Sequence, residues 1–131
     1  MIALDTSSLV AYLSKDSGRD VEAVEVALAE RQACLPPAVL AELLSDPKLP
    51  AEVAAAFKQL PMLPVTDGYW ERVGALRAAV IAQKRKARLA DALIAQSCLD
   101  SGVALVTRDD DFRNYARVCE LDLLLESPRR R

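Results

Sequence analysis

Four acidic residues occupy positions at which folding can bring their carboxylates together into a reactive site. Asp5 follows a short apolar opening, and Asp109 follows the apolar run of residues 103–106. Asp91 stands where a helix begins, and Glu42 lies in an otherwise apolar helical segment. In open α/β sheets, sites form at the carboxyl ends of the strands. If the two strands are neighbours, Asp5 and Asp109 leave the same edge of the sheet, and Asp91 can reach them from its helix.

Metal binding is the chemistry that such a cluster favours. Clustered carboxylates repel one another and take up protons unless a cation neutralises them. The chain has no histidine and only three cysteines, which excludes His-based acid–base catalysis, Ser-His-Asp triads and His-ligated zinc. An oxygen-only ligand set points to Mg²⁺ or Mn²⁺. One such ion, or two about 4 Å apart, can activate water for phosphodiester hydrolysis and neutralise charge on phosphate oxygens.

Each acid also has an ordinary structural explanation. Asp5 can be a helix cap, and Glu42 can be a solvated helix residue. Asp91 can be a favourable charge in the first turn of a helix, and residues 109–111 can be a polar turn. The set as a whole, in this order along the chain, favours the metal site.

The composition is that of an ordinary globular domain. Of 131 residues, 52% are hydrophobic and 27% are charged, with a net charge of −2, so we expect one domain over residues 1–131 with a loose basic tail at 127–131. No apolar stretch reaches the ~18 residues that a membrane span needs, and no secretory leader is recognised, so we expect a cytoplasmic protein without membrane contact. We expect Cys34, Cys98 and Cys119 to be buried, reduced thiols.

Apolar periodicity predicts strands that alternate with helices. The expected strands are residues 1–4, 33–35, 62–65, 103–106 and 119–125. The expected helices begin after Asp5, near residue 21, at Pro36-Pro37, at residue 51, after a cap at Asp67, and at residue 89, the last ending at Gly102. We expect Tyr69 and Trp70 to be core or helix-packing residues. The alternation predicts an α/β fold with a mainly parallel sheet.

Four segments together make the chain resemble the PIN-domain family, and more narrowly the VapC-type toxins of type II toxin–antitoxin pairs. They are residues 1–13 (MIALDTSSLVAYL), 38–44 (AVLAELL), 89–95 (LADALIA) and 105–112 (LVTRDDDF). The resemblance implies a three-layer α/β/α fold with a parallel sheet of about five strands. It also implies Mg²⁺- or Mn²⁺-dependent endoribonuclease activity, inhibition by a cognate antitoxin whose segment fills the active-site groove, and a homodimer.

The resemblance implies roles for individual residues. The catalytic, metal-binding acids that it indicates are Asp5, Glu42, Asp91 and Asp109. Asp111 is close enough to share or replace the role of Asp109, whereas Asp110 is expected to point elsewhere. Thr107 matches a hydroxyl residue that supports the site, and Thr6 can support it through its hydroxyl or backbone.

A basic stretch departs from the family pattern. Many relatives have a Gly/Pro-rich loop before the third motif, where this chain has Lys84-Arg85-Lys86-Ala87-Arg88. The stretch can be a solvated helix end that complements the helix dipole. It can also track the phosphates of RNA beside the carboxylates, which would position the RNA backbone without reading sequence.

The leading hypothesis is therefore a metal-dependent endoribonuclease that acts as a toxin on RNA. The alternative is a catalytically silent PIN-like module that binds RNA or a protein partner. A phosphatase of the haloacid dehalogenase type would also begin from Asp5, but it requires a second aspartate where Ser7 stands.

Overall fold

The structure of the chain is a computed structural model, which describes residues 1–125. Its elements are, in chain order, β1 (Ile2–Leu4), α1 (Thr6–Leu13), α2 (Arg19–Ala29), β2 (Ala33–Cys34), α3 (Pro37–Leu44), α4 (Ala51–Lys58), α5 (Tyr69–Ala82), α6 (Leu89–Ser101), β3 (Ala104–Val106) and α7 (Phe112–Ala116). The sheet is parallel, with the strand order β2-β1-β3. The predicted α/β fold with a parallel sheet is confirmed, whereas the predicted tail at residues 127–131 lies outside the described residues.

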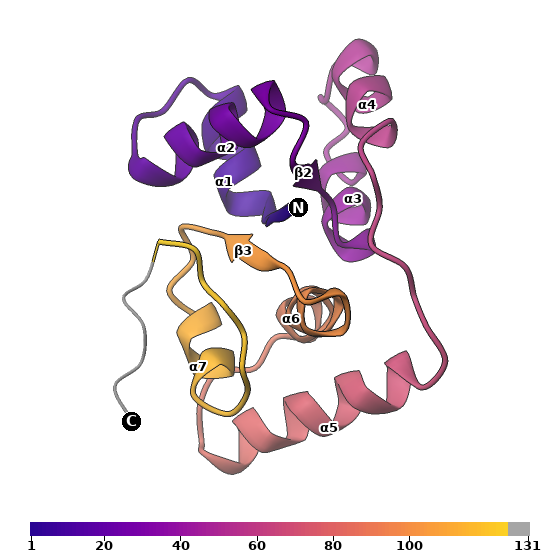
Figure 1. The fold of residues 1–131 in the computed structure, drawn as a ribbon, viewed down its shortest axis with the longest axis vertical. Helices are drawn as coiled ribbons and strands as arrows, with labels where there is room; N and C mark the ends of the chain where they lie inside the picture. Colours follow the sequence, from indigo (N-terminus) through magenta and orange to yellow (C-terminus); the bar gives the residue numbers. More distant parts are fainter. Residues whose placement is uncertain (126–131) are drawn as a thin grey trace.

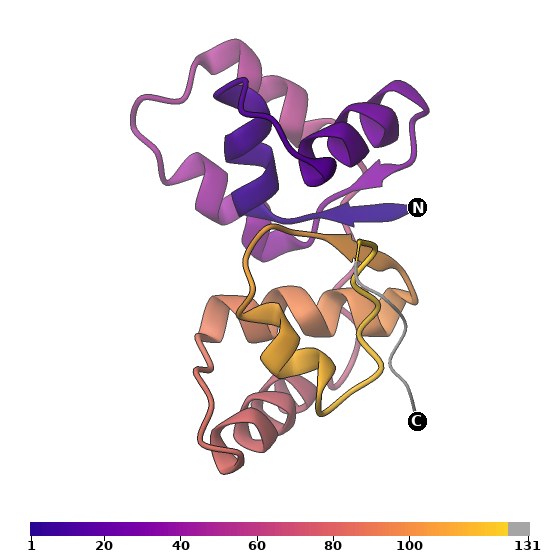
Figure 2. The same cartoon turned by 90° about the vertical axis from the view of Figure 1, so that its left-hand side faces the viewer.

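Helices lie on both sides of the sheet (Figure 1). In the view of Figure 2, α1 and α2 lie above the strands, and α5, α6 and α7 lie below them. Helix α6 lies next to the sheet, and α5 packs on its outer side. Helix α3 packs against both α1 and α6 beside β2. This arrangement gives the three layers expected of the fold.

Helix α6 is the central helix of the core. Ala92, Ile94, Ala95 and Cys98 are almost fully buried, because the helix is covered by the sheet on one side and by α5 on the other. Several of these side chains are small, which allows close packing. The helix ends at Gly102, whose φ of 63° is the left-handed conformation that glycine adopts without a steric cost.

The sheet has three strands within residues 1–125, and the prediction of about five strands is wrong. The segments predicted as the two outer strands each pair with the sheet through a single bridge. Met62 bridges Leu35, and Leu123 bridges Leu105, both in parallel. Both segments lie where outer strands would stand, but one bridge each is too little pairing to make a strand.

Three further expectations about the elements need correction. Residues 112–116 form α7, which apolar periodicity did not predict because the helix is only five residues long. The N-cap of helix α5 is Gly68, not Asp67 as predicted. Tyr69 is buried as expected, but Trp70 is 64% exposed and packs edge-on against the Tyr69 ring.

Two expectations from composition concern the burial of the cysteines and the absence of a membrane span. Cys34 and Cys98 are free thiols and are buried as predicted. The prediction of burial is wrong for Cys119, which is only half-buried and donates a hydrogen bond from its thiol to the Tyr115 carbonyl at 3.0 Å. Within residues 1–125, no helix combines the length and the apolar character that crossing a membrane requires.

Candidate metal centre

The register of β1 against β3 places Asp5 beside Thr107. Leu4 pairs with Val106, and the Asp5 backbone N–H donates to the Val106 carbonyl at 2.9 Å. The hydroxyl groups of Thr107 and Ser7 both donate to Oδ2 of Asp5, each at 2.7 Å. Asp5 is therefore fixed at the end of its strand by two hydroxyl groups, one of them 102 residues away in the chain.

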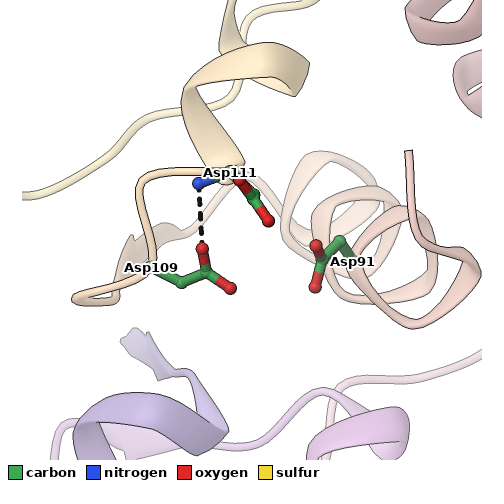
Figure 3. A group of neighbouring side chains, drawn as sticks. All are labelled: Asp91, Asp109 and Asp111. Carbon is green, nitrogen blue, oxygen red and sulfur yellow. Dashed lines mark hydrogen bonds between the residues drawn. The ribbon is translucent and has the colours of Figure 1, made fainter. Parts of the chain in front are cut away.

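Three carboxylates converge near this edge of the sheet (Figure 3). They are Asp91, Asp109 and Asp111, and one oxygen of each lies within 4.8 Å of the other two. Asp91 comes from the first turn of α6, and the other two come from the loop between β3 and α7. Figure 3 shows the carboxylates of Asp109 and Asp111 extending toward Asp91.

Hydrogen bonds within the β3–α7 loop hold two of these carboxylates in place. The Asp109 N–H donates to the Thr107 hydroxyl at 3.0 Å, and the Asp111 N–H donates to Oδ1 of Asp109 at 2.9 Å. Such short-range bonds stabilise a turn in which side chains replace backbone acceptors. Asp110 is exposed, lies 3.6 Å from Arg113 and is not part of the group of three acids, in agreement with the prediction that it points elsewhere.

Burial and mutual repulsion disfavour charge on these acids. Desolvation, followed by repulsion from Asp109 and Asp5, raises the pKa of Asp91 to about 7. Burial also raises the pKa of Asp5, an effect that the hydrogen bonds from Ser7 and Thr107 oppose. A cation placed among the carboxylates would favour their charged forms and release the bound proton.

The donor set fits a divalent cation. Asp91 is 7% exposed, and its Oδ2 has no hydrogen-bond partner among residues 1–125. A buried acceptor without a partner costs free energy, so native proteins usually provide one. An ion held by Asp91, Asp109 and Asp111 would satisfy that oxygen, and an all-carboxylate set suits Mg²⁺ or Mn²⁺.

Glu42 lies outside the group of three acids. It projects from α3, where its Oε1 accepts a hydrogen bond from the Thr6 hydroxyl at 2.7 Å. Thr6 and Glu42 line a hollow of about 210 Å³ between α1 and α3, together with the apolar residues Val10, Leu13, Leu43, Leu49 and Pro50. The structure thus brings Asp91, Asp109 and Asp111 together, joins Asp5 to them through Thr107, and connects Glu42 to Thr6, the residue after Asp5.

The basic stretch turns two of its four cations toward the acids. Lys86 Nζ lies 3.2 Å from Oδ2 of Asp111, and Arg88 Nη2 lies 3.5 Å from the same oxygen. Lys84 and Arg85 are exposed and have no ion pair within residues 1–125. The four residues predicted to bind RNA therefore separate into two pairs with different surroundings.

The sequence did not predict an ion pair that connects the β3–α7 loop to α2. Arg108 donates to both carboxylate oxygens of Asp20, at 2.8 and 3.0 Å, and Ser8 donates to Asp20 at 2.9 Å. The Arg108 N–H also donates to the Ser7 hydroxyl at 3.3 Å. Asp20 looks like an ordinary first-turn charge of α2, and no local pattern links it to a residue 88 positions away.

Comparison with known families adds the classification. The sequence pattern of the PIN domain family matches residues 2–118. The chain belongs to the PIN domain family. PIN domains are in general nucleases that typically bind divalent metals, and every acid described above lies within the matched range. No curated protein is similar enough to the chain to count as a match.

Proposed function

We propose that the protein is a metal-dependent endoribonuclease. The observation that carries the proposal is the group of Asp91, Asp109 and Asp111, in which the buried Oδ2 of Asp91 has no hydrogen-bond partner among residues 1–125. A cluster that only stabilised the fold would be expected to give that oxygen a donor. Because PIN domains are in general nucleases, the reaction class is hydrolysis of RNA phosphodiester bonds.

The acids divide the binding of Mg²⁺ or Mn²⁺ among them. Asp91, Asp109 and Asp111 would hold the ion, while Asp5 at the end of β1 and Glu42 on α3 would add negative charge. When bound, the ion supplies positive charge that activates water and stabilises phosphate oxygens. In this assignment Asp109 and Asp111 both contribute, rather than one replacing the other.

Two threonines support the acids. The Thr107 hydroxyl orients Asp5 at 2.7 Å and accepts the Asp109 N–H at 3.0 Å, so one hydroxyl links the two strand ends. The Thr6 hydroxyl orients Glu42 at 2.7 Å. Partners of ligand carboxylates matter because they fix the orientation in which the carboxylates meet an ion.

We further propose that the protein is the VapC-type toxin of a type II toxin–antitoxin pair, acts in the cytoplasm and forms a homodimer. The four sequence segments that resemble these toxins support this role. The hollow beside Glu42, whose lining combines apolar residues with the charged Asp46 and Lys48, would accept a segment of a cognate antitoxin. Co-expression with the product of a small adjacent reading frame should abolish cleavage, and sedimentation velocity should give a dimer. Cleavage that continues undiminished while the product of the adjacent reading frame is stably bound would contradict the toxin role.

Cleavage of labelled RNA by the purified protein tests the nuclease. Mg²⁺ or Mn²⁺ should support cleavage and EDTA should stop it. Asp5→Asn should abolish cleavage while the circular dichroism spectrum stays that of the folded protein. Metal-dependent cleavage retained by folded Asp5→Asn would contradict the assignment of Asp5.

The alternative, a silent PIN-like module that binds RNA or a protein, is distinguished by its response to metal. A nuclease with this acid cluster should be stabilised by Mn²⁺, since an ion that binds only the folded state raises the melting temperature. A melting temperature unchanged by Mn²⁺, together with no cleavage, would favour the silent module.

A further inference from the structure

The backbone of the basic stretch is held by three side chains in succession. Asn114 donates to the Lys86 carbonyl at 3.2 Å, Arg77 donates to the Ala87 carbonyl at 2.8 Å, and the Tyr115 hydroxyl donates to the Arg88 carbonyl at 2.8 Å. Arg77 belongs to α5, and Asn114 and Tyr115 belong to α7. A solvated helix end would not need three consecutive carbonyls anchored in this way.

The anchoring decides which cations face the acids. Lys86 and Arg88 stand on either side of Ala87, and the carbonyls of all three residues accept the anchoring hydrogen bonds. Ala87 packs against the core, while the side chains of Lys86 and Arg88 remain 56% and 57% exposed. Both cations reach Oδ2 of Asp111, the same carboxylate that approaches Asp91 and Asp109.

We propose that Lys86 and Arg88 bind a phosphate of the RNA strand next to the acid cluster, and that in the metal-free protein the same two side chains neutralise Asp111. This inference rests on the proposed nuclease function. The two roles exclude each other, because a divalent ion on Asp111 competes with both cations for one carboxylate. Binding of the ion therefore releases Lys86 and Arg88 to the phosphate.

Several features favour an RNA phosphate as the ligand. Exposed ion pairs contribute little to stability, so both side chains can leave Asp111 at small cost. Arg and Lys side chains both donate charged hydrogen bonds to phosphate oxygens, and here both project from an anchored backbone. Lys86 and Arg88 lie next to the acid cluster. There they can hold an RNA strand close to carboxylates that would otherwise repel its phosphates.

The test compares two charge-matched double variants, Lys86→Ala/Arg88→Ala and Lys84→Ala/Arg85→Ala. Both remove two cations from the same stretch, but only the first pair contacts Asp111. Mn²⁺ affinity is measured by calorimetry, and affinity for a single-stranded RNA oligonucleotide is measured by anisotropy over a range of salt, with Ca²⁺ replacing Mg²⁺ to slow cleavage. The charge-conserving variant Lys86→Arg/Arg88→Lys is measured alongside.

The inference predicts opposite changes in the first variant. Mn²⁺ should bind Lys86→Ala/Arg88→Ala roughly three- to tenfold more tightly, because two competing cations are gone. RNA should bind it roughly 5- to 25-fold more weakly, with a salt slope smaller by about 0.7, the value for one neutralised phosphate on a single strand. The second variant should change both affinities less, and the charge-conserving variant should restore both.

Equal changes in the two double variants would overturn the inference, since net charge alone would then explain them. Unchanged or weaker Mn²⁺ binding by Lys86→Ala/Arg88→Ala would overturn it as well. Failure of the proposed function looks different: the unmodified protein itself would bind no Mn²⁺ and cleave no RNA.

Discussion

Arg108 and Asp20 form a two-pronged ion pair that connects the loop carrying the acid cluster to the start of α2. The guanidinium donates to both carboxylate oxygens, at 2.8 and 3.0 Å, and Asp20 is 7% exposed. Arg108 stands between Thr107, which holds Asp5, and Asp109, which belongs to the cluster. The pair therefore fixes the β3–α7 loop against α2.

Removing Arg108 should destabilise the protein in a pH-dependent way. The hydrogen bonds from Arg108 hold the pKa of Asp20 below its usual 3.8. This contribution is present above pH 3.8 and is lost as the pH falls through the lower pKa of the folded state. Arg108→Ala should lower the free energy of unfolding at pH 7, because it leaves the nearly buried Asp20 carboxylate without its charged partner. Urea denaturation at pH 7 and pH 3 measures this, and an equal deficit at both would contradict it.

Gly18 is predicted to tolerate no side chain. Its φ is 149°, and an added Cβ would lie 2.6 Å from Oδ1 of Asp20 and 3.1 Å from Nη2 of Arg108. Gly18→Ala should lower the free energy of unfolding by ~1–3 kcal/mol, because it strains the backbone and displaces the ion pair. Gly74→Ala is the matched control, since it has open space in the middle of α5 and should stabilise by ~0.5–1 kcal/mol. Similar melting temperatures for the two variants would count against this account of Gly18.

The metal-free protein should lose stability as the pH rises toward neutrality. The pKa of Asp91 is about 7 in the folded protein and 3.8 in the ordinary case. Between these values the unfolded chain releases a proton that the folded chain keeps, so stability falls with rising pH and levels off above pH 7. In EDTA at pH 8, Asp91→Asn should therefore be more stable than the unmodified protein by ~1–3 kcal/mol, with a much smaller difference near pH 4. A destabilised Asp91→Asn at pH 8 would show that the acid is not strained by its surroundings.

Thr107 should be needed for its hydroxyl rather than for its bulk. Thr107→Val removes the hydrogen bonds to Asp5 and Asp109 while keeping the shape of the side chain. We expect Mn²⁺ affinity or cleavage rate to fall roughly 10- to 100-fold, as for partners that orient metal ligands. Thr107→Ser keeps the hydroxyl and should keep most of the activity. Equal losses in both variants would indicate packing instead.

The sequence predicts the sheet edge better than the details of the site. Asp5 and Asp109 end apolar runs, and parallel strands bring such ends to one edge, as the pairing of β1 with β3 does. The choice between Asp109 and Asp111 could not be made, because it depends on a turn closed by the Asp111 N–H on Asp109. Within the described chain, residues 62 and 123 reach the sheet through one bridge each, a distinction that apolar runs do not carry.

Contacts between distant segments leave no trace in local periodicity. The pairing of Arg108 with Asp20 spans 88 residues, and each residue alone has an ordinary surface explanation. The same holds for Lys86 and Arg88, whose difference from Lys84 and Arg85 arises from carbonyls anchored by α5 and α7. Such contacts depend on tertiary packing, which residue spacing does not encode.

Mn²⁺ titration of the unmodified protein and of Asp91→Asn, followed by calorimetry at pH 7.5, tests the central claim most directly. Asp91 carries the buried oxygen that lacks a hydrogen-bond partner among residues 1–125, so the unmodified protein should bind Mn²⁺ and release protons as it does so. Folded Asp91→Asn should show no measurable binding. Mn²⁺ binding of equal affinity in the two proteins would contradict the assignment of this cluster as the metal centre.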